Sequence, residues 1–171
     1  FFQAEDGIRD KLVTGSDVCS SDLDRISTWV DVDCSWRAEH HTAGAVDRLR
    51  EEISKNDAQG FTHYVNAEND GWFKSDEGQE FFATAAQLKV VASVALTPAW
   101  LSDLRVVATA NPTLPFLIHH MGMPKNTGSG YDQHEVSELL ECAKVPNIGV
   151  KISGFNYNNR DRKSTRLNSS H

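Results

Sequence analysis

Three features are scarce in this sequence: cysteine, long apolar runs and basic charge. The 171 residues include only three cysteines, none of them spaced as C-x-x-C, which argues against a disulfide-bonded scaffold and against a zinc knuckle. No apolar stretch approaches the roughly 20 residues of a membrane-spanning helix. The 24 Asp and Glu outnumber the 17 Lys and Arg, for a net charge of −7, which argues against nucleic acid as a partner. We therefore expect a cytoplasmic protein with neither a nucleic-acid nor a membrane partner.

The two ends of the chain resemble translated sequencing adapter. Gln3–Asp10 (QAEDGIRD), Ser16–Leu23 (SDVCSSDL) and Asp161–His171 (DRKSTRLNSSH) each match the translation of a common adapter run. The alternative is an acidic leader and a basic, Ser-rich tail. We expect residues 1–23 to be a non-native leader and 161–171 a non-native tail. Residues 24–160 would then be a metagenomic fragment of the protein itself.

Within residues 24–160, short apolar strands alternate with helices. Strict alternation of this kind predicts right-handed crossovers and a parallel sheet. Five segments rich in apolar, β-branched and aromatic residues predict the strands: Ile26–Val32, Phe61–Val65, Val90–Leu96, Phe116–His120 and Ile148–Ser153. Residues that favour helix starts precede four helical patterns: Thr42, Ser75, Pro98 and Asp132.

Two architectures fit this alternation: an open doubly wound sheet and a β/α barrel. The open sheet is typical of chains with a Gly-rich phosphate loop directly after a strand. The only G-S-G, at Gly128–Gly130, follows no strand directly and is not followed by Lys and Ser or Thr. We therefore predict the α/β class and a partial TIM-type (β/α) barrel of about five parallel strands.

Polar side chains follow each predicted strand. In both architectures the C-terminal ends of the strands carry the chemistry. Any one of these residues fits a solvated loop, so their common position is the stronger signal. His40 and His41 are predicted to lie in a loop without metal-ligand spacing nearby, and His63 and His134 to be structural. The residues at the strand ends are Asp31, Asp33, Asn66, Glu68, Asn69, Asp70, Thr97, His119, His120, Lys151 and Ser153.

Two segments resemble the amidohydrolase-related family, of the second amidohydrolase type. PFLIHHMGMP and the later VPNIGVKISGF resemble its sixth and seventh strand segments, which usually carry Asp-His-x-Gly-x-Pro and then Pro-Asn followed by Lys-x-Ser-Gly. Gln59–Phe61 and VVASVALTPAW fit the fourth and fifth strands less specifically. The family comprises β/α-barrel hydrolases, lactonases and decarboxylases. The resemblance implies that residues 24–160 span the third to the seventh strand of such a barrel.

The resemblance assigns expected roles to matching positions. His120 matches the sixth-strand histidine, a metal ligand in some members and a substrate-binding group in others, and His119 replaces the preceding aspartate. Lys151 and Ser153 match the Lys-x-Ser. We expect His120 to face the pocket as a catalytic residue or metal ligand, and His119 to face the helix layer or orient a neighbour. We expect Lys151 to act in catalysis by holding an anionic group of the substrate. The predicted substrate-binding residues are Asn66, Glu68, Asp70 and Ser153.

Two departures from the family pattern leave the cofactor open. The fifth strand has Ala95 and Thr97 where metal-using relatives often have a histidine, and the first and eighth strands lie outside the chain. One divalent metal, zinc or similar, and a metal-free site are both compatible with this. The expected activity is hydrolysis of a lactone, ester or amide carbonyl in a small carboxylated substrate. The alternatives are a metal-dependent decarboxylase and a barrel that binds a ligand without turnover. We expect the fragment itself to be inactive.

Overall fold

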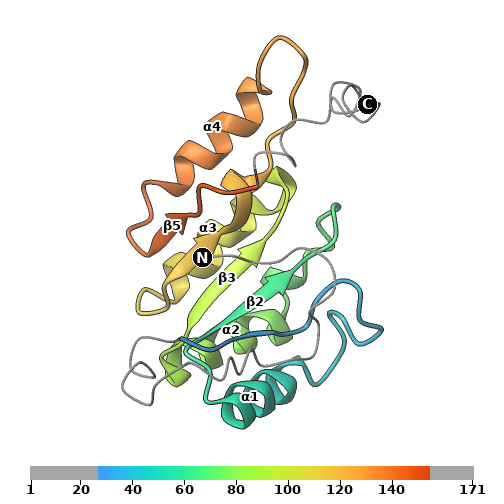
Figure 1. Cartoon of the computed structure of the whole chain (residues 1–171), viewed down its shortest axis with the longest axis vertical. Helices are drawn as coiled ribbons and strands as arrows, with labels where there is room; N and C mark the ends of the chain where they lie inside the picture. The colour runs from blue at the N-terminus through green and yellow to red at the C-terminus, as the bar shows by residue number, and fades with distance from the viewer. Residues whose placement is uncertain (1–26, 155–171) are drawn as a thin grey trace, which may run out of the picture.

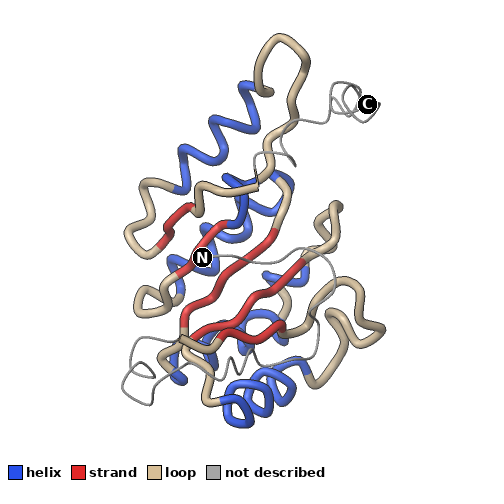
Figure 2. Tube along the Cα trace, in the orientation of Figure 1, coloured by secondary structure: helices blue, strands red, loops and turns tan. Residues whose placement is uncertain are grey.

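The computed structural model describes residues 27–154, which form one parallel sheet with its connecting helices (Figures 1 and 2). Each strand pairs in parallel with the next one in the chain. A doubly wound sheet reverses its strand order at a switch point, whereas a β/α barrel adds each strand beside the previous one. The sequential order confirms the predicted α/β class and fits a segment of a barrel. The strands are β1 (Trp29–Asp31), β2 (Gly60–Tyr64), β3 (Val91–Ala95), β4 (Phe116–Ile118) and β5 (Ile148–Val150).

Helices connect successive strands, and Figure 1 shows α2 and α3 running behind the central strands. The predicted leader and tail (1–23 and 161–171) and the first residue of the first predicted strand lie outside the described residues. The helices are α1 (Ala45–Asn56), α2 (Asp76–Leu88), α3 (Leu101–Ala110) and α4 (Gln133–Cys142), and the short 3-10 segments are η2 (Trp72–Lys74), η3 (Pro98–Trp100) and η4 (His119–Gly122).

Side-chain caps confirm two predicted helix starts and contradict a third. The Ser75 hydroxyl accepts a hydrogen bond from the backbone N–H three residues on, and the Asp132 carboxylate accepts two such bonds at the start of α4. Thr42 does not cap α1, because its hydroxyl donates to the carbonyl of the residue three positions earlier. The helix begins at Ala45 instead, after Gly44 with a φ of 89°.

The two faces of the sheet have different neighbours. Phe61 of β2 and Phe116 of β4 are fully buried and contact the rings of α2, so they point to the helix-facing side. Alternation along a strand turns Thr62 and the register partner Ser93 to the opposite face. In a closed barrel that opposite face is the interior.

Strands β4 and β5 end earlier than the sequence predicts. β4 ends at Ile118, so His120 lies in η4 with a left-handed backbone (φ 49°, ψ 38°). β5 ends at Val150, so Lys151 and Ser153 follow the strand. His120 is left-handed, and Lys151 and Ser153 lie beyond the last residue of β5. Strand alternation therefore does not tell which way these three side chains point.

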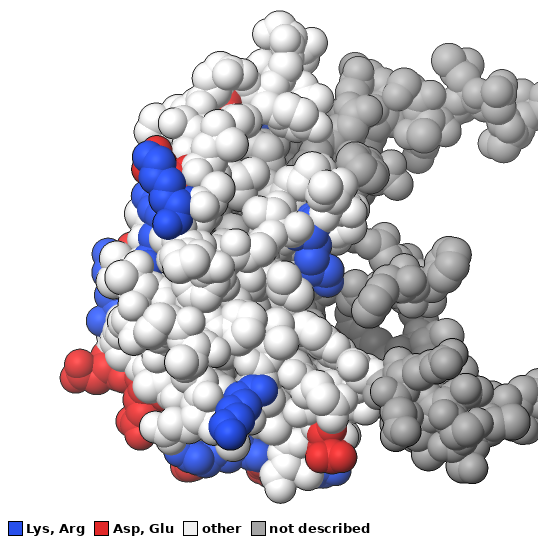
Figure 3. All heavy atoms as spheres, turned by 90° about the vertical axis from the view of Figure 1, so that its left-hand side faces the viewer, with Lys and Arg blue, Asp and Glu red and all other residues white. Residues whose placement is uncertain are grey.

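Uncharged side chains make up most of the face drawn in Figure 3, and described Lys and Arg side chains lie at several places on it, some of them beside Asp or Glu. Among residues 27–154 no helix combines the length and the apolar character needed to cross a bilayer. The predicted absence of nucleic-acid and membrane partners stays a prediction.

Gly78 permits the close packing of α2 on η2. A Cβ at this position would lie 2.0 Å from the carbonyl oxygen of Trp72, which is backbone and cannot move aside. We expect Gly78→Ala to lower the free energy of unfolding by about 2 kcal/mol, because the cost of overpacking exceeds the gain in helix propensity. Urea titration measures the change. The matched control is Glu80→Ala on the exposed side of the same helix, and an equal stability of the two variants would contradict the expectation.

Candidate functional site

His119 is a buried imidazole at the C-terminal edge of the sheet. Its Nε2 is hydrogen-bonded to the Ser93 hydroxyl of β3 and lies 3.3 Å from Nζ of Lys151, and its ring packs edge-on against Tyr64 of β2. Of the two roles expected for His119, facing the helix layer is therefore wrong, and orienting a neighbour stays a prediction. Because Ile118 points into the core with the helices, the residue after it faces the opposite way. We call His119 and Lys151 the mouth pair.

In the mouth pair a neutral imidazole, that of His119, lies beside the ammonium cation of Lys151. An ammonium group only donates hydrogen bonds, so Nε2 of His119 presents its lone pair and Nδ1 carries the proton. Burial first, and then the charge of Lys151, lower the pKa of His119 to about 3, so the imidazole is neutral at neutral pH. Burial also lowers the pKa of Lys151. Among residues 27–154 the buried Nδ1 of His119 has no hydrogen-bond partner, and it can donate to an oxygen that becomes negative.

His120 contacts the other predicted residue of the seventh-strand motif. Its Nδ1 lies 3.1 Å from Oγ of Ser153. Gly154, with a φ of 65°, approaches the same ring so closely that a Cβ there would overlap Nδ1. In the structure, His120 therefore contacts Ser153, and Lys151 contacts His119. The catalytic and metal-binding roles predicted for His120 and the substrate role of Ser153 stay predictions.

The loop after β2 holds the remaining predicted substrate-binding residues, Asn66, Glu68 and Asp70. Asn66 and Glu68 are exposed, and the Asn66 carbonyl accepts a hydrogen bond from the indole of Trp100. Asp70 is turned towards His41, whose Nδ1 lies 2.6 Å from its carboxylate. Through His41, Asp70 contacts a second cluster of polar side chains, which does not include the mouth pair.

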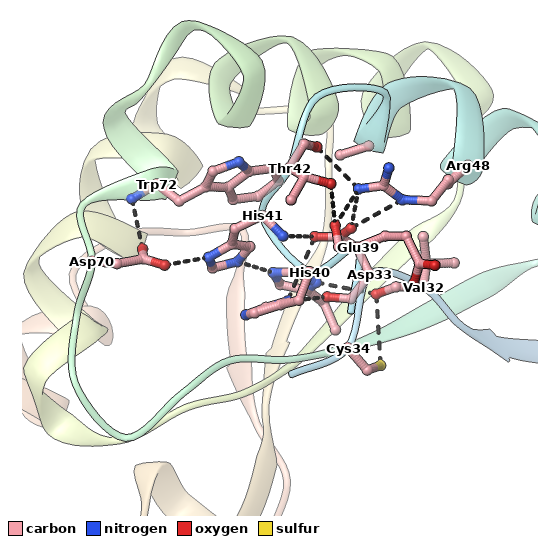
Figure 4. A network of polar contacts seen from close by, with 12 residues as sticks. Val32, Asp33, Cys34, Glu39, His40, His41, Thr42, Arg48, Asp70 and Trp72 are labelled. Atoms are coloured by element: carbon pink, nitrogen blue, oxygen red, sulfur yellow. Dashed lines mark hydrogen bonds and ion pairs between the residues drawn. The ribbon is translucent and has the colours of Figure 1, made fainter. Parts of the chain in front are cut away.

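That second cluster consists of Asp33, His41 and His63, which we call the β1–β2 cluster. Figure 4 labels Asp33 and His41 of this cluster. Each residue offers one metal-ligand atom, and the three atoms lie within 4.8 Å of one another. Nε2 of His41 lies 3.3 Å from Nε2 of His63. Two imidazole nitrogens and a carboxylate oxygen form a donor set that can hold a divalent metal.

Asp33 is the charged centre of the network in Figure 4. Its side chain is fully buried and accepts hydrogen bonds from the guanidinium of Arg48 and, at 3.0 Å, from the backbone N–H of His41. Burial alone would raise the pKa of this carboxyl. Hydrogen bonds from His40, His41 and Arg48 outweigh burial and hold the pKa well below its usual range, so Asp33 is a carboxylate at neutral pH.

The sequence did not indicate this cluster. His41 was expected to be a loop residue without metal spacing nearby, and His63 to be structural. His63 is separated from His41 by 22 residues and lies on β2, whereas His41 lies in the loop after β1. Ligands on adjacent strands have no fixed spacing in sequence. The signal that could have found them is that β1 and β2 pair, which brings Asp33 near the end of β2.

A family model matches most of this chain. The model is described as amidohydrolase, and it matches residues 16–166. The chain belongs to the amidohydrolase family. The resemblance noted from the PFLIHHMGMP and VPNIGVKISGF segments is confirmed. The match runs past residues 24–160 at both ends, and the predicted boundaries of leader and tail stay predictions.

Two crystal structures of amidohydrolases from Burkholderia multivorans resemble the fold of this chain. The first, with bound HEPES, is 19% identical with a TM-score of 0.54, and the alignment covers 67% of this chain and 42% of that one. The second, with bound zinc, is 18% identical with a TM-score of 0.57, and covers 78% and 46%. At these identities the likeness shows the fold, and this amidohydrolase chain spans less than half the length of either protein. A search of curated proteins found no match.

Among residues 27–154 the only group of three metal-ligating side chains is the β1–β2 cluster, and His120 does not belong to it. The metal role predicted for His120 in this amidohydrolase stays a prediction.

Proposed function

We propose that the protein hydrolyses the carbonyl of a lactone, ester or amide in a small carboxylated substrate. Membership of the amidohydrolase family supports a hydrolase. The observation that carries the substrate class is the contact between Lys151 and His119 at the C-terminal edge of the sheet, where β/α barrels gather their reacting groups. Because the chain spans less than half of the structures it resembles, the active protein in this proposal is the one encoded by the complete reading frame.

Each member of the mouth pair has a role in this proposal. The ammonium of Lys151 binds the substrate carboxylate, and the Nδ1–H of His119 donates to the carbonyl oxygen as negative charge develops on it. The prediction assigned the polarising role to His120. The buried, unpaired Nδ1 among the described residues favours His119 for that role, and His120 with Ser153 would then contact the substrate beside it.

The test measures acid release by the complete enzyme from carboxylated lactones, esters and amides and from their uncharged analogues. We expect a higher kcat/KM for the carboxylated compounds. Lys151→Met should lower kcat/KM for these by about 100-fold, the worth of a charge-assisted hydrogen bond, and change it little for uncharged analogues. Lys144→Met, which removes an exposed lysine of similar length, is the matched control.

Two results would contradict the proposal. Release of carbon dioxide from candidate acids without carbonyl hydrolysis would indicate the decarboxylase alternative. Saturable ligand binding without any turnover would indicate a ligand-binding barrel. If Lys151→Met lowered kcat/KM equally for carboxylated and uncharged substrates, this lysine would not bind the carboxylate.

A further inference from the structure

The β1–β2 cluster lies on the opposite side of the sheet from the mouth pair. His63 packs against the rings of Phe81 and Phe82 on α2, and its side chain is completely buried. The next residue, Tyr64, contacts the ring of His119 instead. Adjacent residues of a strand point to opposite faces, so the two groups of polar side chains are separated by the sheet. The proposed hydrolysis does not use the β1–β2 cluster.

The outer nitrogen of each histidine in the cluster faces an acceptor. Nδ1 of His63 lies 3.1 Å from the carbonyl oxygen of Val32, which can only accept a hydrogen bond. Nδ1 of His41 lies 2.6 Å from the carboxylate of Asp70. Both Nδ1 atoms therefore carry a proton, and both neutral rings present a lone pair at Nε2. Metal-binding histidines have this arrangement, with the second nitrogen donating to a carboxylate or a backbone carbonyl.

The two lone pairs face each other across 3.3 Å. Such a contact is repulsive unless a proton or a metal cation lies between the nitrogens. A shared proton would make one ring cationic, and the complete burial of His63 opposes a charge that water cannot solvate. A metal cation relieves the repulsion without protonating either ring.

The geometry and charge of the cluster suit zinc. With zinc–nitrogen bonds of about 2.05 Å, nitrogens 3.3 Å apart subtend an angle of about 107° at the metal, close to tetrahedral. The ionised carboxylate of Asp33 is the third ligand and supplies negative charge. The nearby Cys34 thiol donates to the carbonyl oxygens of Val32 and Thr62 and is not among the ligands.

We propose that Asp33, His41 and His63 bind one zinc ion on the helix-facing side of the sheet, where the ion joins the loop after β1 to strand β2. Asp70 acts as a positioning residue, because its carboxylate fixes the His41 ring with Nε2 towards the metal. The ion is structural in this proposal, since it lies across the sheet from the mouth pair.

The test uses the full 171-residue chain after removal of metals with a chelator. Isothermal titration with zinc should show saturable binding of one ion per chain, and binding should raise the melting temperature. Cobalt, used as a spectroscopic replacement, should give the visible absorption of a tetrahedral site with nitrogen and oxygen ligands. These readouts do not depend on enzymatic activity, so they can fail or succeed independently of the proposed hydrolysis.

Variants locate the ion. His41→Gln should abolish the one-ion binding and the cobalt spectrum, and Asp70→Asn should weaken zinc binding by about 10- to 100-fold while leaving one ion per chain. The matched control, His134→Gln, removes an exposed histidine on α4 and should bind zinc as the unaltered chain does. His63→Gln tests the remaining histidine ligand. If this variant does not fold, His41→Gln and Asp70→Asn still show whether the ion binds at this cluster. Zinc binding unaffected by His41→Gln, or no stoichiometric binding by the stripped chain, would overturn the proposal.

Discussion

Asp33→Asn is expected to lower the free energy of unfolding by about 3 kcal/mol, because it removes one partner of a buried ion pair. The carboxylate is fully buried and accepts hydrogen bonds from Arg48, whose side chain is itself only 28% exposed. An amide carries no charge and presents one acceptor oxygen in place of two. The substitution therefore leaves the Arg48 charge without a counterion in a partly desolvated position.

Urea unfolding in a chelating buffer measures this effect apart from metal binding. The matched control is Asp47→Asn, which neutralises an exposed acid in the first turn of α1 and should change stability by less than about 0.5 kcal/mol. Arg48→Met should destabilise the chain as well, since it leaves the Asp33 carboxylate buried without its cation. Equal stability of the Asp33 and Asp47 variants would show that the ion pair contributes nothing in this fold.

Lowering the pH is expected to destabilise the fold already at pH values well above the pKa of ordinary carboxylates. Burial lowers the pKa of both His63 and His119 to about 3, whereas in the unfolded chain a histidine titrates near 6.5. Between these values the unfolded state binds more protons than the folded state, so stability rises with pH and is lost as the pH falls. The loss between pH 7 and pH 5 is about 2 kcal/mol for each of the two groups.

Denaturant titrations at several pH values in a chelating buffer test this expectation. His119→Gln should remove about half of the pH dependence, because one of the two buried imidazoles is gone. His134→Gln, at an exposed position, should leave the slope unchanged. A stability that is constant from pH 7 to pH 5 would contradict the neutral, buried state of both histidines.

The fold could be predicted from the sequence because its signals are local. Alternation of apolar strands with helices predicted the parallel sheet, and the capping residues Ser75 and Asp132 predicted where α2 and α4 begin. Thr42 failed as a cap because its hydroxyl reached a nearby carbonyl, and Gly44 provided the turn instead. The prediction of where β4 ends failed for a related reason. Left-handed residues such as His120 end this strand two residues earlier than the sequence predicts.

The candidate site could be predicted only in part. The strand-end position and the family resemblance pointed to Lys151 and to adjacent histidines, and the structure brings these side chains to one edge of the sheet. Which histidine contacts the lysine depended on the last residue of β4, because one residue reverses the face of the sheet. The pairing of His41 with His63 depends on two strands meeting, and no spacing in the sequence encodes it.

The sequence by itself determined the class of the fold, the family and the edge of the sheet where the polar side chains lie, because these follow from periodicity, from capping residues and from two short motifs. Only the tertiary structure decided that His119 contacts Lys151 and that Asp33, His41 and His63 converge behind the sheet. These contacts join residues far apart in the chain, and their geometry depends on how strands pair and where each one ends.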